Sequence, residues 1–371
     1  MEEKGKPNLI GMTMAELADF VERIGQPRYR SQQIFEWLYA RGAEDIDAMT
    51  NLGKAFRAQL KLASNLESLE LAREQGSSLD GTKKYLFRLR DGLHVESVLI
   101  PSAPSSAVDD EEADEAQPTG RLTLCVSTQV GCPLDCAFCA TGTMGFSRNL
   151  SVAEILGQVL SIRRRNGNTL TNLVFMGMGE PLLNYDKVMT AAEILSTGVG
   201  IAAKRITVST AGRPDRIRQM ADEKRRVKLA ISLHSAVDVT RSKLMPINRK
   251  FSLQELGDAI EYYYRATRQR ITYEVIFFEG VNDTERELKA LIKFAGRVPC
   301  KINAIPFHSI SFTSPSGFAA TLRPSPRVEE LVNTMRAHHL TVMIRSSAGE
   351  DIDAACGQLA VTPSINAGLP A

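Results

Sequence analysis

The sequence predicts an α/β fold: a partial (β/α)6 barrel with a small helical N-terminal domain and a β-hairpin extension. Three observations support this prediction. From residue 121 on, short segments rich in Val, Ile and Phe alternate with segments of helical period, the pattern of βαβ units and a parallel sheet. The preceding region has a helical period and then a hairpin signal. About six units are too few for an eight-stranded barrel, so we expect an open barrel with its chemistry at the C-terminal strand ends.

The first element is helical. Residues 12–75 have helical character, and in "SQQIFEWLYARG" the apolar positions Ile34, Trp37 and Leu38 recur at helical spacing before Gly42 ends the run. We therefore assign residues 1–75 to a helical N-terminal domain.

Residues 76–120 follow as a hairpin and an insertion. "TKKYLFRLRDGLHVESVLIP" reads as two strands joined at Asp91-Gly92, a strong hairpin signal. Residues 101–120 hold six acidic residues and no Lys or Arg, so we expect a flexible linker. Without them the chain has 45 basic and 37 acidic residues. This balance suits a polyanionic partner, although many basic proteins never bind nucleic acid.

The barrel is assigned to residues 121–346 and a C-terminal loop and tail to residues 347–371. Candidate strands lie in "RLTLCVST", "TNLVFMGM", "KRITVST", "VKLAISL", "RITYEVIFF", "CKINAIP" and "LTVMIRS". No apolar run approaches the ~20 residues needed to span a bilayer. The N-terminus is acidic before it is apolar, unlike a secretion signal, and six clustered cysteines indicate a reducing compartment. We expect a cytoplasmic protein without membrane contact.

Three cysteines, Cys132, Cys136 and Cys139, form a C-x3-C-x2-C motif just after the first barrel strand. Compactly spaced thiolates hold iron–sulfur clusters or zinc. Structural zinc normally takes four protein ligands, and the sequence has no second pair because Cys300 and Cys356 are isolated. A 4Fe–4S cluster held by three cysteines would leave one iron open to an outside ligand. A zinc site or a redox C-x2-C pair is the alternative.

Polar residues follow the next three strands. Gly179 and Glu180 lie in "FMGMGEPLLN", where glycine allows close backbone approach and the carboxylate can accept from an ammonium group. Ser209 ends the next strand, and the following strand ends in Ser232, Leu233 and His234. Taken alone, the Gly179–Glu180 motif is equally explained as a strand-to-helix turn, and His234 as a structural histidine. Together at one sheet edge they predict a shared ligand pocket.

The cysteine motif, with Phe138 before its last cysteine, resembles the signature of the radical S-adenosylmethionine (SAM) superfamily. The longer match is to one of its families, the adenine-C2 methyltransferases of 23S ribosomal RNA and transfer RNA. "GEDIDAACGQLA" resembles the loop of the family's methylated cysteine, here Cys356. "LTLCVSTQVGC" contains Cys125, "HVESVLIP" contains Glu96, and "YRSQQIFEWLY" resembles the family's RNA-recognition domain. The resemblance runs from about residue 12 to 362.

This resemblance implies the chemistry. Cys132, Cys136 and Cys139 would hold the 4Fe–4S cluster, and SAM would be contacted by Gly179, Glu180, Ser209, Ser232, Leu233, His234 and His308. His308 stands where many relatives have asparagine. Two SAM molecules are used per turnover: one methylates Cys356, and the other provides the radical that activates the new methyl group. Glu96 would remove the adenine C2 proton, and Cys125 would release the product by forming a disulfide with Cys356.

The implied partners are 23S rRNA at the peptidyl-transferase centre, tRNA in the anticodon loop 3′ of the anticodon, and an electron donor such as flavodoxin or ferredoxin. We expect a monomer. Cys300 has no role in this scheme and is assigned to the core. For RNA contact, Tyr29 and Trp37 are candidates for stacking, and Arg28, Arg30 and Arg41 for phosphate binding; core packing of the two aromatic residues and solvation of the arginines explain them equally well. The run Arg163–Arg165 is expected to be a solvated helix end, with lining of an RNA path as the alternative.

Three alternatives stay open. The C8-methylating resistance enzymes of the same group share the cluster, the glutamate and both reactive cysteines. A glycyl-radical activating enzyme would use the cluster motif but would not need Cys125, Cys356 and Glu96 together. A non-catalytic iron–sulfur or zinc protein that binds RNA would need neither reactive cysteine.

Overall fold

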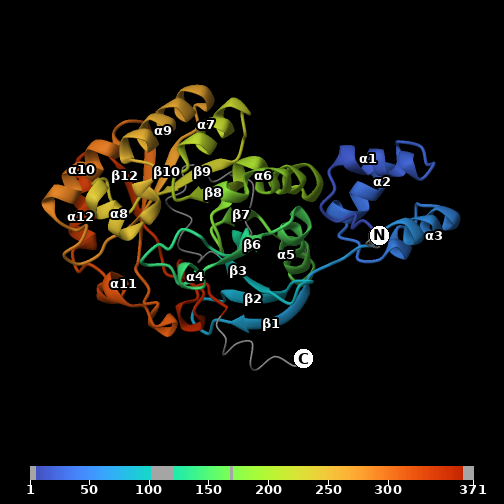
Figure 1. Cartoon of the computed structure of the whole chain (residues 1–371), viewed down its shortest axis with the longest axis horizontal. Coiled ribbons are helices and arrows are strands. Elements are labelled where there is room, and N and C mark those ends of the chain that lie inside the picture. The colour runs from blue at the N-terminus through green and yellow to red at the C-terminus, as the bar shows by residue number, and fades with distance from the viewer. Residues whose placement is uncertain (1–5, 102–119, 168–169, 362–371) are drawn as a thin grey trace.

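The structure is a computed structural model that describes residues 6–101, 120–167 and 170–361. Its centre is a ten-stranded sheet in the order β1-β2-β3-β4-β7-β8-β9-β10-β11-β12 (Figure 1). Each neighbouring pair from β4 to β12 is parallel. The parallel strands are β4 (Leu122–Cys125), β7 (Asn172–Phe175), β8 (Ile206–Thr210), β9 (Lys228–Ser232), β10 (Ile271–Ile276), β11 (Cys300–Ile305) and β12 (Thr341–Ile344).

These parallel strands fall within the segments that the sequence predicts, and the α/β partial-barrel class is confirmed. The last segment adds β12 beside β11, one strand beyond the six-unit expectation. Helices connect the parallel strands and lie along the outside of the sheet (Figure 1). They are α5 (Val152–Arg165), α6 (Tyr185–Ile194), α7 (Pro214–Asp222), α8 (Asp238–Leu244), α9 (Leu253–Thr267), α10 (Glu285–Ala295), α11 (Gly317–Thr321) and α12 (Val328–Ala337).

Three antiparallel strands extend the sheet on the β4 side. The predicted hairpin is confirmed as β2 (Lys83–Arg88) and β3 (His94–Pro101), and β3 pairs with β4 in the register Val98↔Cys125. The helical assignment of residues 70–75 is wrong, because Glu70–Gly76 forms β1 against β2. Its polar sequence, "ELAREQG", has little strand propensity of its own. Pairing with β2 supplies the backbone hydrogen bonds that decide its conformation.

The N-terminal helices are α1 (Met14–Arg23), α2 (Arg30–Phe35), which continues as the π-turn η1 (Glu36–Ala40), and α3 (Lys54–Ala63). They group at the opposite end of the molecule from α10 and α12 (Figure 1). The described residues contain no helix long and apolar enough to span a bilayer. The acidic insertion falls almost wholly on residues 102–119, outside the described residues.

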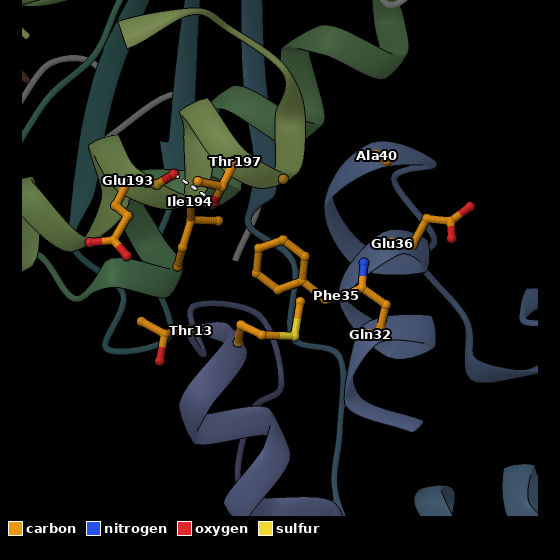
Figure 2. Close-up of a pocket in the computed structure, with 10 residues that line it drawn as sticks. Thr13, Gln32, Phe35, Glu36, Ala40, Glu193, Ile194 and Thr197 are labelled. Carbon is orange, nitrogen blue, oxygen red and sulfur yellow. Dashed lines mark hydrogen bonds between the residues drawn. The ribbon is translucent and has the colours of Figure 1, made fainter. Parts of the chain in front are cut away.

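The N-terminal helices meet the barrel at α6 and at η5 (Leu195–Val199), and a cavity of about 360 Å³ lies between them (Figure 2). Phe35 of α2 lies in it opposite Ile194. Two arginines of α5 reinforce the junction. Arg163 Nη1 donates to the carbonyl of Tyr39 at 2.8 Å, and Arg164 pairs with Glu44 at 2.6 Å. The expectation that these two arginines are only a solvated helix end is therefore wrong.

Candidate functional site

The three-cysteine motif lies in a loop between two short strands that the sequence did not predict. Strand β5 (Gln129–Gly131) pairs antiparallel with β6 (Phe146–Asn149), and Cys132 directly follows β5. The Cys132 N–H donates to the carbonyl of Gly145 at 2.8 Å. Gly131 has φ +73°, and a Cβ there would meet the Gly145 oxygen at 1.9 Å. Only glycine permits this closure of the loop.

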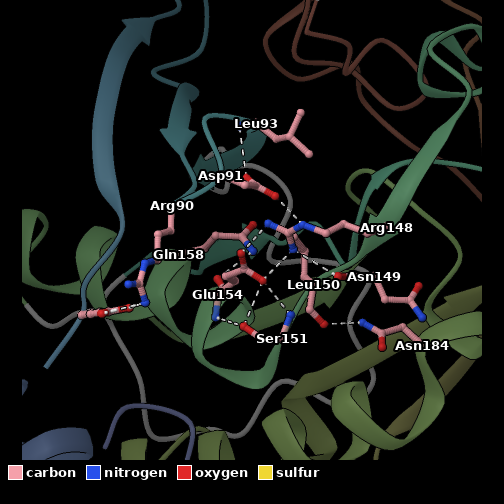
Figure 3. Close-up of polar contacts among 11 residues, drawn as sticks. Arg90, Asp91, Leu93, Arg148, Asn149, Leu150, Ser151, Glu154, Gln158 and Asn184 are labelled. Atoms are coloured by element: carbon pink, nitrogen blue, oxygen red, sulfur yellow. Dashed lines mark hydrogen bonds and ion pairs between the residues drawn. The ribbon is translucent and has the colours of Figure 1, made fainter. Parts of the chain in front are cut away.

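Figure 3 shows how this loop is held against the β2–β3 hairpin. Arg148 of β6 donates to Asp91 in the hairpin turn at 2.6 Å and to Glu154 of α5 at 2.8 Å. Glu154 also forms a capping box with Ser151 at the start of α5. The strand carrying Glu96 and the loop carrying the cysteines are thus fixed relative to each other by charge-assisted hydrogen bonds.

The three thiols are close enough to affect one another electrostatically. Burial, together with the neighbouring Cys139, raises the pKa of Cys132 to about 12 and that of Cys136 well above its ordinary value. Thiols in this state become thiolates only beside strong positive charge, which a metal centre supplies. In the described part of the chain no three His, Cys, Asp or Glu side chains converge on one ion. A 4Fe–4S cluster takes each thiolate at a separate iron, so these thiols fit that group.

Glu180 faces the same loop. It is 3% exposed, and its charge contributes to the raised pKa values of Cys132 and Cys136. Its carboxylate accepts from the backbone N–H groups of Leu182 at 2.9 Å and Ala211 at 2.7 Å. Burial raises the pKa of Glu180, and these N–H groups work against that rise. The carboxylate is thus held in one orientation at the end of β7, where it can accept from an ammonium group.

Gly179 lets the chain reach this position. Its φ is +103°, and a Cβ would lie 2.6 Å from the Cβ of Gln129. The close approach brings Gln129 Oε1 within 2.8 Å of the Glu180 N–H. The glycine that the sequence singled out is therefore a requirement of both conformation and packing.

The ends of β8 and β9 also turn toward the cysteine loop. Ser209 lies within β8, Ser232 ends β9, and Leu233 is buried beside it. The His234 ring packs against Phe138, between Cys136 and Cys139, at 4.3 Å between centroids. His234 Nδ1 accepts from the Ile276 N–H, and burial lowers the pKa of His234 to about 3. The imidazole is therefore neutral and carries its proton on Nε2.

Sequence reasoning missed Arg241, whose side chain is 1% exposed. It donates to the carbonyls of Ala211 at 2.6 Å, Ser232 at 3.0 Å and Leu233 at 3.1 Å. Arg241 thus joins the ends of β8 and β9 through three backbone oxygens. A single arginine in a short helix is usually solvated, so no local signal marked this one.

Glu96, Cys125 and Cys356 form a second group beside the cysteine loop. Burial and the nearby Cys356 raise the pKa of Cys125, the last residue of β4, to about 12. Burial, then Glu274 and Cys139, raises the pKa of Cys356 to about 11. Cys356 is nevertheless an exposed residue, so the protein surrounds its thiol without covering the whole residue. All six cysteines are free thiols here, and Cys300 is buried as expected.

The segment around Cys356 is fastened on two sides. The carbonyl of Gly357 accepts from the Ala140 N–H at 2.7 Å, and that of Leu359 accepts from the Thr141 hydroxyl at 2.6 Å. Both donors belong to α4 (Ala140–Thr143), which directly follows Cys139. On the hairpin side, Glu96 accepts from the Ala360 N–H at 3.1 Å. The structure therefore brings Glu96, Cys125, Cys139 and Cys356 into one site.

Glu274, whose charge raises the pKa of Cys356, belongs to a polar pair that the sequence did not identify as functional. Asn303 of β11 donates to Glu274 of β10 at 2.9 Å, and Asn303 Oδ1 has no hydrogen-bond partner. His308 is also buried, and its Nδ1 lies 3.5 Å from Glu350 without a hydrogen bond. Contact of His308 with SAM stays a prediction.

Among the RNA-contact candidates, the structure separates two aromatic residues. Tyr29 is 59% exposed, with the Arg30 guanidinium 5.1 Å from its ring centroid. Trp37 is half-buried against the core, donates to Asn51 and lies under Arg41. Tyr29 is therefore available for stacking, whereas Trp37 is mainly a packing residue.

Comparison with known proteins identifies the family of this chain. Residues 7–66 match the ribosomal RNA large subunit methyltransferase N-terminal domain, and residues 126–294 match the radical SAM superfamily. Over 361 residues, the chain is 41% identical to a probable dual-specificity RNA methyltransferase RlmN of Flavobacterium psychrophilum, covering 96% of this chain and 98% of the relative. A dual-specificity RNA methyltransferase RlmN of Marinobacter nauticus is 40% identical, with 95% and 92% covered.

The fold comparison gives the same result. A crystal structure of a radical SAM methyltransferase from Sphaerobacter thermophilus has a TM-score of 0.84 and 41% sequence identity to this chain. The match covers 95% of this chain and 99% of that one. Both the helical N-terminal region and the barrel are thus shared, and the chain belongs to the RlmN family of radical SAM RNA methyltransferases.

Proposed function

We propose that this enzyme methylates C2 of one adenine in 23S rRNA, at the peptidyl-transferase centre, and C2 of the adenine 3′ of the anticodon in tRNA. The observation that carries the proposal is that Cys356 lies near Cys125 and Cys139, while its segment is bonded to Glu96 through the Ala360 N–H. A cluster-bound radical enzyme needs only the three motif cysteines. Two further thiols and a buried carboxylate beside them suit a reaction that passes through the protein itself.

In this proposal Cys132, Cys136 and Cys139 hold the 4Fe–4S cluster, and Glu180 accepts from the SAM ammonium group. Gly179, Ser209, Ser232, Leu233, His234 and His308 line the rest of the SAM site. When bound, the cluster and SAM supply the 5′-deoxyadenosyl radical and exchange the electrons that the reaction needs. The neutral His234 is suited to this position because it adds no positive charge beside the SAM sulfonium.

The chain's own residues carry the methyl group. Cys356 first takes a methyl from one SAM: a new S–C bond forms, the sulfonium S–C bond breaks, and the thiol proton is lost. Once this methyl has been activated at the SAM site and its carbon has joined adenine C2, the adduct would return one electron to the cluster held by the three motif cysteines, and its C2 proton would pass to Glu96. The Cys125 thiolate then attacks Cys356 Sγ. The S–S bond forms, the S–C bond breaks, and the released carbon takes a proton to become methyl.

Anaerobic incubation of reconstituted enzyme with SAM, a reductant and each RNA, followed by nucleoside mass spectrometry, tests this function. We expect 2-methyladenosine in both RNAs. 8-Methyladenosine would place the enzyme with the C8-methylating relatives. SAM cleavage without any methylated adenosine would contradict the substrate, and product in only one RNA would contradict the dual specificity.

We propose a cytoplasmic monomer that receives electrons from a flavodoxin or ferredoxin and has no membrane partner. The exposed Tyr29 and the neighbouring Arg28 and Arg30 support RNA contact through the N-terminal helices, by stacking and phosphate binding.

A further inference from the structure

We propose that Lys84 is a positioning residue that orients Glu96 for proton abstraction and couples it to the segment carrying Cys356. The inference rests on the proposed function, in which Glu96 takes the proton from adenine C2. In that step the C2–H bonding pair stays on the base and the proton moves to one carboxylate oxygen. Nothing in the sequence distinguished Lys84 from its neighbour Lys83.

The register of the hairpin places Lys84 beside Glu96. Glu96 of β3 lies opposite Leu86 of β2, and Lys84 is two residues from Leu86 and therefore on the same face. Such diagonal neighbours are within reach of a long side chain. Lys84 Nζ lies 3.3 Å from Glu96 Oε1, and both side chains are almost fully buried, at 7% and 2% exposed.

The same two side chains contact the C-terminal segment on both sides of Cys356. Lys84 Nζ donates to the carbonyl of Asp353 at 3.2 Å. Glu96 Oε2 accepts from the Ala360 N–H at 3.1 Å. Each carboxylate oxygen is therefore engaged, one by Lys84 and the other by the segment itself. A shift of residues 353–360 would alter both contacts, so the position of Cys356 and the orientation of the Glu96 carboxylate are linked.

The charges facing Glu96 explain why Lys84 matters for a base. Burial raises the pKa of Glu96; Lys84, from β2, and the Ala360 N–H lower it, and Asp353, from the C-terminal segment, raises it. A carboxyl accepts a proton only when it is ionised, which requires a pH above its pKa. Without the Lys84 charge, only the Ala360 N–H among the groups that act on the Glu96 pKa would oppose burial and Asp353, so the ionised form of Glu96 would need a higher pH.

Lys83 provides a matched control. It is adjacent in the chain but points to the opposite face of the sheet. There it pairs with Glu74 at 3.1 Å, and both side chains are partly exposed, at 43% and 36%. Substituting Lys83 removes the same charge from the same strand without touching Glu96.

The test uses full-length, cluster-loaded enzyme with SAM, reductant and tRNA. Four quantities are measured for Lys84→Met, Lys84→Gln, Lys84→Arg and Lys83→Met: SAM cleavage, methylation of Cys356 by peptide mass, covalent protein–RNA adduct, and product formation against pH. We expect Lys84→Met and Lys84→Gln to cleave SAM, methylate Cys356 and accumulate adduct. The acidic limb of their pH profile should move up by about 1–3 pH units. Lys84→Arg and Lys83→Met should follow the parent profile.

If Lys84→Met or Lys84→Gln cleaves SAM but shows neither a shifted acidic limb nor accumulated adduct, the inference is overturned. A Lys83→Met profile shifted as far as that of Lys84→Met would do the same. Glu96→Gln, assayed in parallel, distinguishes a failure of the role of Lys84 from a failure of the proposed function. Normal turnover by Glu96→Gln would remove the base assigned under the proposed function and the role of Lys84 with it. Adduct in Glu96→Gln beside parental behaviour in both neutral Lys84 variants would overturn only the role of Lys84.

Discussion

Glu96 and Ala360 are 264 residues apart in the chain, and the Ala360 N–H donates to Glu96 Oε2 at 3.1 Å. This bond joins the β2–β3 hairpin, in the antiparallel part of the sheet, to the segment that follows the last parallel strand. Asp353 and Ala360, on either side of Cys356 in the chain, both contact the Lys84–Glu96 pair. The hairpin therefore holds the segment that carries Cys356.

Replacing Cys356 with alanine should abolish RNA methylation and leave SAM cleavage intact, because the thiol carries the methyl group but does not hold the cluster. Nucleoside and 5′-deoxyadenosine mass spectrometry measure the two outcomes separately. Cys300→Ala is the control. Cys300 is buried in the core, so that variant should lose about 1 kcal/mol of stability and stay active. Undiminished methylation in Cys356→Ala would remove this residue from the mechanism.

Replacing Cys125 with alanine should trap a covalent protein–RNA adduct, because no neighbouring thiol remains to attack Cys356 Sγ. Denaturing gel electrophoresis with labelled tRNA detects the adduct, and ribonuclease digestion confirms its RNA content. Adding Cys356→Ala in the same chain should eliminate the band. Turnover at the parental rate with no retained RNA would show that another group releases the product.

Gly179→Ala should weaken SAM binding and destabilise the protein, because the new Cβ would lie 2.6 Å from the Cβ of Gln129 at φ +103°. We expect a loss of about 1–3 kcal/mol, measured by denaturant unfolding, and a raised KM for SAM. Gly200→Ala is the matched control. Gly200 also has a positive φ, +89°, but no atom lies within 4 Å of its Cβ position. Equal losses in the two variants would mean that strain, and not the contact with Gln129, decides the effect.

Arg148→Ala should lower the free energy of unfolding at pH 7 by about 1 kcal/mol. On acidification, the free energy of unfolding of this variant should fall less than that of the parent. Glu154 is partly buried, which would raise its pKa, but Arg148 and Ser151 lower it below its usual value. A lowered carboxyl pKa stabilises the fold above the unfolded pKa of about 4.3, and this contribution is lost as the pH falls through the folded pKa. Urea unfolding at pH 7 and at pH 3 to 4 measures the difference between parent and variant.

Arg90→Ala is the control for that experiment. Arg90 lies next to Asp91, but its side chain is 82% exposed and its only ion pair among the described residues is with Glu67. It should change stability little at either pH. An equal effect of the two substitutions would show that the hydrogen bonds of Arg148 do not anchor the cysteine loop.

Local pattern was enough to predict much of the molecule. The parallel strands are short, apolar and bounded by helices of clear period, so their positions could be predicted from nearby residues alone. The same holds for the hairpin at Asp91-Gly92 and for the C-x3-C-x2-C motif, whose spacing brings three thiols together within one loop. Cys125, Cys356 and Glu96 were identified differently, by resemblance, because nothing in their own surroundings indicates reactivity.

The sequence by itself therefore determined the strand–helix alternation, the cysteine loop and, through likeness to relatives, the reactive residues. Tertiary structure decided what depends on contacts between distant segments. Pairing with β2 made a strand of the polar residues 70–76. Burial gave Arg241 its three carbonyl partners, and sheet register turned Lys84 toward Glu96 but Lys83 away from it. A lysine or arginine reads as a solvated side chain in sequence, because only the folded chain supplies the low-dielectric surroundings and the partner that make its charge decisive.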